Sequence, residues 1–259
     1  MKKSERLNKN DRQERILAEL RAGPTVRVSE LAEAFGVTTE TVRRDMDELT
    51  RRGLVDRTYG GAATRAMAAE PAMRERDLLS VPERERIARA AVTFVEPGDV
   101  LMIDNGSTTA HFARRLASEG SRLTVITNSY TVATACGRNK TIRVVVCPGE
   151  FHPDEGGVYG EDTLAFIRRF RADKAIIGAG GLTPEGVTDV DSGACWVKRT
   201  MIERTESRFL LLDSGKYNAK LLEVVCPLSD INQLISDKEP VGKLRESIIK
   251  AGVKVLNAD

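Results

Sequence analysis

The feature that most constrains this chain is an amphipathic segment over residues 37–53. Val42, Met46 and Leu49 are spaced four and three residues apart, so they share one face of an α-helix, while charged residues occupy the other faces. Thr38 precedes this helix as its predicted N-cap, and a glycine stands at its end. The pattern therefore predicts a surface helix with both ends marked.

A shorter helix is predicted just upstream, over residues 28–36, with Ser29 as its N-cap and Gly36 at its end. Two helices joined by a short turn that contains glycine form a helix-turn-helix unit, whose second helix can lie in the DNA major groove. Arg43 and Arg44 on the second helix would then face bases or phosphates. The two helices together indicate a protein that reads double-stranded DNA.

Strand-like segments flank the two helices. Residues 54–62 are typical of a strand that ends in a glycine-pair turn, and residues 25–28 are typical of a strand that pairs with it. These segments would form a wing beside the second helix, from which Arg57 and Tyr59 would reach the DNA backbone. A further helix is predicted over residues 10–20, with its apolar side turned to the core of this unit.

This unit resembles the N-terminal winged helix of DeoR-type bacterial transcriptional regulators. The resemblance is carried by four segments, Ser29-Glu30-Leu31-Ala32, Phe35-Gly36-Val37, Thr41-Val42-Arg43-Arg44-Asp45-Met46 and Gly60-Gly61-Ala62. Thr38 and Tyr59 depart from the family pattern, which usually has Ser and often has His at these places. The resemblance implies operator DNA as a partner, and the expected DNA-binding residues are Ser29, Thr38, Thr39, Thr41, Arg43, Arg44, Arg57 and Tyr59.

The chain of 259 residues is long enough for a small domain and a larger one with its own core. We predict a winged helix-turn-helix domain over residues 1–62, a linker over residues 63–82 and an effector-sensing domain over residues 83–259. The net charge is only +2, so DNA binding would depend on the helix-turn-helix motif and not on bulk positive charge.

The composition also argues against several kinds of protein. No apolar run approaches the roughly 20 residues that cross a bilayer, and no signal peptide is recognisable, so a cytoplasmic protein without membrane contact is expected. The cysteines are scattered and form no Cys-x-x-Cys pair, so neither a disulfide nor a metal site is predicted, and no cofactor is expected. Buried thiols are expected at Cys136, Cys147, Cys195 and Cys226.

Beyond residue 82, short apolar runs alternate with helical stretches. Strands are predicted over residues 100–103, 123–126, 142–146, 174–178 and 209–212. Helices are predicted over residues 82–92, 109–116, 129–136, 162–170 and 194–203. The alternation predicts a larger α/β domain with a mainly parallel sheet.

Polar residues and glycines follow each of the five predicted strands, and ligands of such sheets gather at the carboxyl ends of the strands. Residues 104–109 offer a glycine, three hydroxyls and the start of a helix, a combination that suits a phosphate. Ser or Thr at a helix start is also a common cap, so this run alone leaves both interpretations open. Lys216, after the fifth strand, would add a positive charge.

The resemblance to the DeoR family continues through this domain. It is carried by Asp104 with Gly106-Ser107-Thr108-Thr109, Thr127-Asn128-Ser129, Gly149, Gly160 and Asp213-Ser214-Gly215-Lys216, while Pro148 stands where a second glycine is common. The resemblance implies a sugar-phosphate-isomerase-like fold and a phosphorylated sugar as effector. The expected effector-binding residues are Asp104, Gly106, Ser107, Thr108, Thr109, Thr127, Asn128, Ser129, Gly149, Asp213 and Lys216.

Several other polar or aromatic residues have two interpretations. Asp189 and Asp191 could orient sugar hydroxyls, but a solvated turn is favoured, and residues 198–199 are interpreted as a solvated helix face. Trp196 could anchor a subunit contact or fill the core, and the core is favoured.

Two functions fit these observations. The first is a transcriptional regulator, most simply a repressor of a carbohydrate-utilisation operon, acting as a homodimer or homotetramer because one winged helix reads few base pairs. The alternative is an aldose–ketose phosphate isomerase with a DNA-binding appendage, in which Asp104, Asp213 and Lys216 would move protons and hold the enediolate. A regulator is favoured, because sensing is sufficient once a DNA-binding unit is present.

Overall fold

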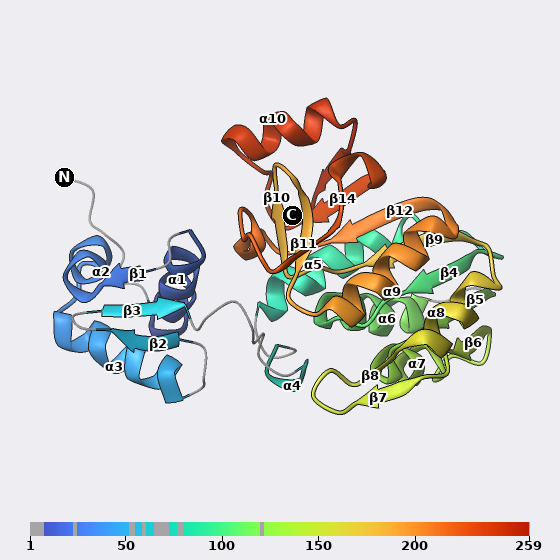
Figure 1. Ribbon diagram of the computed structural model, residues 1–259, viewed down its shortest axis with the longest axis horizontal. Helices are drawn as coiled ribbons and strands as arrows, with labels where there is room; N and C mark the ends of the chain where they lie inside the picture. Colours follow the sequence, from blue (N-terminus) through green and yellow to red (C-terminus); the bar gives the residue numbers. More distant parts are fainter. Residues whose placement is uncertain are drawn as a thin grey trace. The chain divides into compact units, whose positions relative to one another are not determined.

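The computed structural model describes residues 8–22, 25–51, 55–58, 61–64, 73–76, 80–119 and 122–258. The chain divides into two compact units, residues 1–71 and residues 72–259, which are described separately below (Figure 1). Within the described residues, no helix is long and apolar enough to cross a membrane.

The first unit is a winged helix-turn-helix. Its elements are α1 (Lys9–Ala22), β1 (Thr25–Arg27), α2 (Val28–Phe35), α3 (Thr39–Arg51), β2 (Val55–Thr58) and β3 (Gly61–Thr64). The three strands form an antiparallel sheet in the order β1-β3-β2. The predicted fold of this unit is confirmed.

The apolar stripe of α3 is the core of the first unit. Val42, Met46 and Leu49 are at most 2% exposed, and they pack with Ile16 of α1 and Phe35 of α2. At the start of α3 the backbone N–H of Thr41 donates to the Thr38 hydroxyl at 3.2 Å, which confirms the predicted cap.

The predicted cap of α2 is wrong. This helix begins at Val28, directly after β1, so Ser29 lies in its first turn, and the N-cap residue Arg27 makes no side-chain capping bond. The N-cap therefore lies two residues before the predicted one, and the physical reason is burial, because the Val28 side chain packs in the core as part of the helix. At the other end, Gly36 adopts φ +63°, the left-handed conformation expected of it.

The second unit is built on a seven-stranded parallel sheet. Its strands are β4 (Val100–Ile103), β5 (Leu123–Thr127), β6 (Ile142–Val146), β9 (Ala172–Ile177), β12 (Thr205–Leu211), β14 (Gln233–Ser236) and β15 (Lys254–Asn257). Its helices are α4 (Met73–Arg76), α5 (Val81–Val92), α6 (Ser107–Glu119), α7 (Tyr130–Cys136), α8 (Glu161–Arg168), α9 (Ser192–Glu203) and α10 (Gly242–Lys250). The predicted α/β class with a mainly parallel sheet is confirmed.

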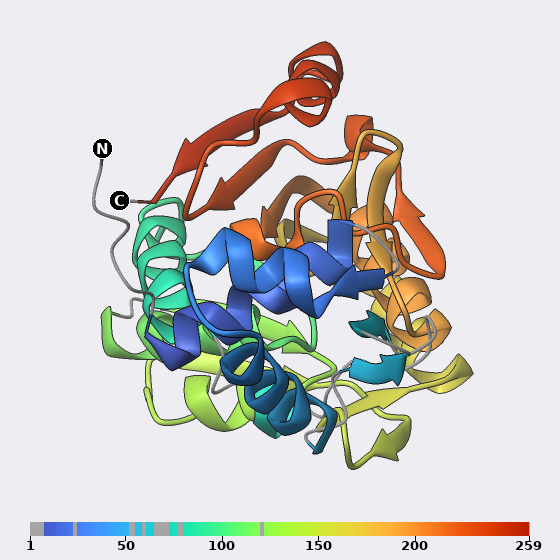
Figure 2. The ribbon, with the colours of Figure 1, turned by 90° about the vertical axis from the view of Figure 1, so that its left-hand side faces the viewer.

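The strand order of this sheet reverses its direction between β4 and β9. The order is β15-β14-β12-β9-β4-β5-β6, so the chain runs outward from β4 to β6 and then returns to β9 on the other side of β4. Figure 2 shows β15 and α10, in red, at one end of this sheet. Between β4 and β9 the direction of winding reverses, and ligands of open α/β sheets bind at the carboxyl ends of strands at such a point.

Helices cover both faces of the sheet. Leu101 and Ile103 of β4 belong to one core cluster, with residues of α5, α6 and α7, whereas Met102 belongs to a second, with residues of α8, α9 and α10. The alternation along one short strand follows from the two-residue period of a strand. The unit is thus a three-layer α/β/α sandwich (Figure 1).

Two small antiparallel elements lie at the edge of this sandwich. They are the hairpin of β7 (Glu150–His152) and β8 (Gly157–Tyr159), and a sheet of β10 (Gly181–Thr183), β11 (Gly186–Asp189) and β13 (Glu223–Cys226). The sequence did not predict these two antiparallel elements, nor β14, β15 and α10. All of these segments are short and lack a sustained apolar period. The four cysteines are buried free thiols, as expected.

Candidate functional site

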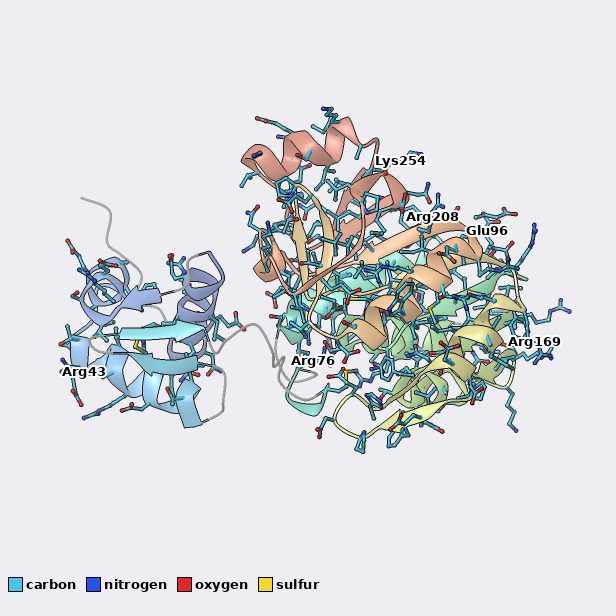
Figure 3. All side chains as sticks on the ribbon, in the orientation of Figure 1. Arg43, Arg76, Glu96, Arg169, Arg208 and Lys254 are labelled. Carbon is cyan, nitrogen blue, oxygen red and sulfur yellow. The ribbon has the colours of Figure 1, made fainter. Side chains whose placement is uncertain are left out.

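The candidate DNA-binding face lies on α2, α3 and the residue that caps α3. Ser29, Thr38, Thr39, Arg43 and Arg44 are exposed, and Thr41 is half-buried beside its cap. The Arg44 side chain is 79% exposed, and its Nε lies 3.5 Å from Oε1 of Glu40, which is also exposed. Figure 3 shows Arg43 projecting from α3. These side chains form a polar surface on the helix that the sequence assigns to DNA reading.

Asp45 of the same helix points inward. Its carboxylate accepts from Arg12 of α1, with Oδ2 2.5 Å from Nε and Oδ1 3.1 Å from Nη2, and both side chains are buried. This two-point ion pair holds the reading helix against α1. No role for Asp45 was predicted, although it lies three residues after Val42, on the apolar face of the helix.

The wing contacts stay predictions. The backbone of Arg57 lies in β2 opposite Ala62, but its side chain and the whole of Tyr59 lie outside the described residues.

The candidate effector site begins at the switch point between β4 and β9, in the β4–α6 turn, which comprises residues 104–109. The Asp104 carboxylate accepts from the backbone N–H of Gly178, which follows β9, at 3.1 Å. The Thr109 hydroxyl donates to the carbonyl oxygens of Asp104 and Gly106 at 3.0 and 2.9 Å. The turn is thus closed on itself and fixed to the neighbouring strand.

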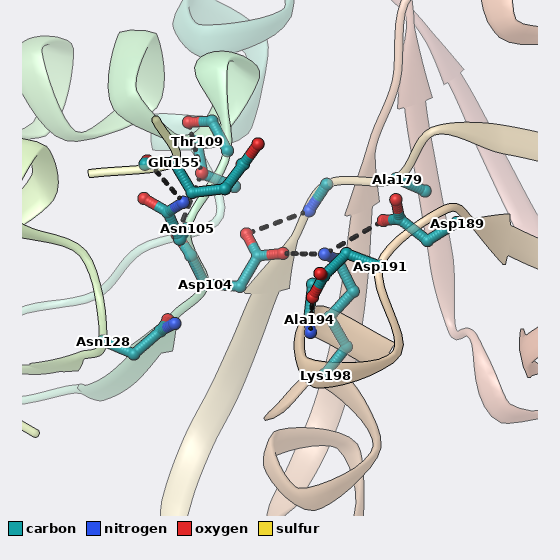
Figure 4. Close-up of polar contacts among 12 residues, drawn as sticks. Asp104, Asn105, Thr109, Asn128, Glu155, Ala179, Asp189, Asp191, Ala194 and Lys198 are labelled. Carbon is teal, nitrogen blue, oxygen red and sulfur yellow. Dashed lines mark hydrogen bonds and ion pairs between the residues drawn. The ribbon is translucent and has the colours of Figure 1, made fainter. Parts of the chain in front are cut away.

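A buried lysine completes this end of the site. Lys198 of α9 is 4% exposed, and its Nζ lies 3.2 Å from Asp104 Oδ2 and 3.1 Å from Asp189 Oδ2 (Figure 4). The prediction of a solvated face at Lys198 and a solvated turn at Asp189 is therefore wrong. Lys198 shares the inward face of α9 with Ala194, Val197 and Met201, and a lysine within an apolar helical stripe is the signal that was missed.

The three charged side chains of this cluster shift one another's pKa. Burial lowers the pKa of Lys198, but Asp189 and Asp104 outweigh it, so the pKa lies well above its ordinary value. Burial raises the pKa of Asp104 and is only partly offset by Lys198. Burial also raises the pKa of Asp189, but the charge of Lys198 and the hydrogen bond from the backbone N–H of Val190 lower it further, so this pKa lies below its ordinary value. Lys198 is thus cationic, and Asp104 is the more readily protonated acid.

Two asparagine side chains face the site from the turns after β4 and β5. Asn105 Nδ2 donates to the carbonyl oxygen of Glu155 at 2.8 Å and to the Tyr159 hydroxyl at 3.1 Å, and Asn128 Nδ2 donates to the carbonyl oxygen of Val158 at 3.1 Å. Both Oδ1 atoms are buried and have no hydrogen-bond donor among the described residues. Buried acceptors without donors are rare in folded proteins and mark a place where a ligand can bind.

The predicted hydroxyl residues divide into two groups. Ser107 and Thr108 are at most 4% exposed, and their hydroxyls have no hydrogen-bond partner in the part of the chain that the structure describes. Thr127 accepts from the backbone N–H of Ser129 at 3.0 Å, and Ser129 caps α7 by accepting from Val132 at 3.3 Å. The first group is available to a ligand, whereas the second group and Thr109 shape the turns.

Gly149 has a structural role in the hairpin. It has φ +146°, and an added Cβ would lie 2.1 Å from Thr163 Oγ1 and 2.5 Å from the Tyr159 carbonyl oxygen. Only glycine allows the backbone to approach so closely.

The turn after β12 brings further charges to the same edge. Asp213 lies 3.8 Å from Arg84 Nη2, with both side chains buried. Lys216 Nζ donates to the carbonyl oxygen of Ala179, which follows β9, at 2.6 Å. The loops after β4, β9 and β12 therefore meet at one edge of the sheet, as the sequence predicted.

Trp196 of α9 and Asp191, which directly precedes this helix, depart from their predicted surroundings. Trp196, expected in the core, is 50% exposed, with the Arg199 guanidinium 5.0 Å from its ring centroid. Asp191 caps the helix by accepting from the backbone N–H of Ala194 at 2.6 Å. The helix turns Lys198 inward, and Trp196, two residues earlier, therefore faces outward.

Comparison with known proteins agrees with this architecture. A DeoR-like helix-turn-helix domain matches residues 12–66, and a DeoR C terminal sensor domain matches residues 80–238. The chain is 32% identical over 216 residues to the glycerol-3-phosphate regulon repressor of Escherichia coli (strain K12), covering 83% of this chain and 85% of that relative. It is 27% identical over 251 residues to the transcriptional repressor CsqR of the same organism, covering 96% of each.

A solved D-ribose-5-phosphate isomerase in complex with phospho-erythronic acid covers 52% of each chain at 20% identity, with a TM-score of 0.38, which is too low to support a conclusion. The two domain matches cover most of the chain, and the relatives match it across both units. This chain belongs to the DeoR family of transcriptional regulators.

Proposed function

We propose that the protein is a cytoplasmic repressor of a carbohydrate-utilisation operon, and that a phosphorylated sugar bound at the β4–α6 turn changes its affinity for the operator. The observation that carries the proposal is the set of ligand-type groups at the switch point of the sheet. They are the unpartnered hydroxyls of Ser107 and Thr108 and the unpartnered amide oxygens of Asn105 and Asn128. One relative is named as a glycerol-3-phosphate regulon repressor, which fits a small phosphorylated effector.

The two kinds of group suit the two ends of such a ligand. The start of α6, a helix of 13 residues, offers backbone N–H groups and the hydroxyls of Ser107 and Thr108 to a phosphate. The amide oxygens of Asn105 and Asn128 accept hydrogen bonds only, so they suit sugar hydroxyls. We assign Asp104, Gly106, Asp213 and Lys216 to the walls of the site, and Thr109, Thr127, Ser129 and Gly149 to its shape.

The DNA-binding face implies a symmetric assembly. A single reading helix contacts few base pairs, whereas two copies related by a two-fold axis read two half-sites about one helical turn apart. We therefore propose that a homodimer, or a tetramer built from it, binds an operator with two related half-sites through Arg43, Arg44 and the neighbouring threonines.

Thermal unfolding of the full chain tests the ligand class. Glycerol 3-phosphate and larger sugar phosphates are compared with glycerol, inorganic phosphate and n-propyl phosphate, which lacks the hydroxyls. A ligand of the native state raises its stability by about 2.7 kcal/mol at a concentration 100 times its Kd. We expect the largest shift from a sugar phosphate, and shifts with the free sugars alone would contradict the proposal.

A pair of threonine variants locates the phosphate. Thr108→Val removes a hydroxyl that has no partner, so we expect weaker binding by about tenfold or more with little loss of stability. Thr109→Val is the matched control, because it removes a hydroxyl that holds the turn closed and therefore mainly costs stability. Equal ligand affinity in Thr108→Val and the parent would contradict the phosphate assignment.

We also propose that the site binds its ligand without converting it. The Asp104 carboxylate is held by Gly178 and Lys198, and Lys216 donates to a backbone carbonyl, so neither group is positioned as a free proton carrier. Interconversion of aldose and ketose phosphates by purified protein, abolished in Lys216→Ala, would instead support the isomerase alternative.

A further inference from the structure

The β7–β8 hairpin covers the candidate effector site on one side. It accepts two hydrogen bonds from Asn105, through the Glu155 carbonyl and the Tyr159 hydroxyl. Its Gly157 lies so close to Asn105 that an added Cβ would be 2.9 Å from the asparagine Cγ. The unpartnered oxygen of Asn105 is therefore enclosed beneath the hairpin.

The same hairpin holds helix α4 on its other side. The backbone N–H of Met73 donates to the Asp154 carbonyl at 2.8 Å, and Arg76 forms an ion pair with Glu155. The side chains of Met73 and Arg76 are buried, although this segment falls within the range predicted as an exposed linker. Figure 3 labels Arg76 on α4. The segment is therefore docked on the second unit, residues 72–259, which is called the sensor unit from here on.

A third contact joins α4 to the opposite wall of the site. Arg84 of α5 donates through Nη1 to the carbonyl oxygen of Arg76, while its Nη2 lies 3.8 Å from the Asp213 carboxylate. Two separate routes, one through Asn105 and the hairpin and one through Asp213 and Arg84, thus link the candidate site to this short helix.

We propose that α4 is a latch whose docking depends on occupancy of the effector site and reports that occupancy to the connector before it. This inference rests on the proposed function. A ligand hydroxyl reaches the Asn105 oxygen only if the hairpin moves away, and the hairpin moves with Glu155, the partner of Arg76. Effector binding therefore releases α4, the first described element after the DNA-binding unit.

Allosteric coupling is the quantity to measure, because a latch carries free energy between two sites without belonging to either. The full-length protein is titrated onto an operator selected from random-sequence DNA, with and without glycerol 3-phosphate. We expect the parent to show a coupling factor of about 5 to 150 in operator Kd. Arg76→Met brings this factor close to 1, while calorimetry shows a Kd for glycerol 3-phosphate that is no weaker than the parent value, because ligand binding no longer has to release α4.

Two further variants sharpen the test. Lys174→Met is the matched control, because Lys174 of β9 forms a similarly buried ion pair with Asp99, which directly precedes β4 at the end of the sheet away from the site, and it keeps the parent coupling. The exchange of both charges, Arg76→Glu with Glu155→Arg, restores part of the coupling that Arg76→Met loses. Protection of the Met73 amide in hydrogen exchange falls when ligand binds the parent.

The outcomes separate the two proposals. If no phosphorylated probe changes operator affinity in the parent, the proposed function fails, and the latch fails with it because it rests on that function. If the parent is coupled and Arg76→Met is coupled equally, the latch is wrong. Loss of glycerol 3-phosphate binding in Arg76→Met also overturns it, because Arg76 would then belong to the binding site itself.

Discussion

The two units use their charged residues in opposite ways. On the DNA-binding unit, Arg43 and Arg44 are exposed, and the buried pair of Arg12 with Asp45 orients the helix that carries them. In the sensor unit the charges are enclosed, with Lys198 lying between two buried carboxylates. The difference teaches that a surface which reads DNA can be recognised from one helix, whereas a ligand site is assembled from distant segments.

The largest effect is expected from Lys198→Met, which leaves Asp104 and Asp189 buried without their cation. Removing one partner from a buried ion pair costs about 3–5 kcal/mol. Urea unfolding followed by the fluorescence of Trp196, the chain's single tryptophan, reports on the sensor unit. Lys220→Met is the control, because that lysine is 69% exposed and we expect a change below about 0.5 kcal/mol. If Lys198→Met and Lys220→Met lost similar amounts of unfolding free energy, the buried position of Lys198 would not account for its effect.

A slightly smaller effect is expected from Asp45→Ala in the first unit, about 3 kcal/mol, because it removes the buried carboxylate that pairs with the Arg12 guanidinium. Hydrogen exchange of the α3 amides measures the loss, since exchange resolves the stability of separate regions. Operator binding is lost with it, while stabilisation of the sensor unit by ligand stays. Glu40→Ala, which removes an exposed carboxylate from the same helix, keeps both properties.

The double variant Arg43→Ala with Arg44→Ala changes recognition and not stability. Both side chains are exposed, so unfolding is unchanged within about 0.5 kcal/mol. Operator affinity falls by about tenfold or more per arginine that contacts a base or phosphate. Fluorescence anisotropy at fixed salt measures the change, and parent affinity in the double variant would show that another surface reads the DNA.

The smallest effect is the pH dependence of sensor-unit stability. The lowered pKa of Asp189 contributes stability that is present above its ordinary pKa near 3.8 and is lost as the pH falls below that value. The raised pKa of Asp104 has the opposite effect. The stability that it contributes is fully present below pH 3.8 and is lost as the pH rises through the pKa of Asp104 in the folded protein.

Asp189→Asn therefore reduces the pH dependence of the unfolding free energy below about pH 3.8, and Asp104→Asn reduces it above that pH. Each slope is at most about 1.4 kcal/mol per pH unit for one proton. Urea midpoints between pH 3 and pH 7 measure both, and equal profiles for the two variants would contradict the assignment of opposite shifts.

Much of the fold could be predicted because its signals are local. The stripe of Val42, Met46 and Leu49 needs only the helical period, and each of the five predicted strands appears within a few residues of its predicted bounds. The small sheets and the elements after β12 were missed, since short strands are stabilised by neighbours that the sequence does not specify.

The sequence by itself determined the helix-turn-helix, the parallel α/β class and the polar ends of its strands, because each depends on residues close together in the chain. Only the tertiary structure decided which of those polar groups meet. It paired Lys198 with Asp104 and Asp189, enclosed the oxygen of Asn105 beneath a hairpin and docked α4 on the sensor unit. Burial and pairing depend on contacts between segments about 50 to 90 residues apart, and no local pattern records those contacts.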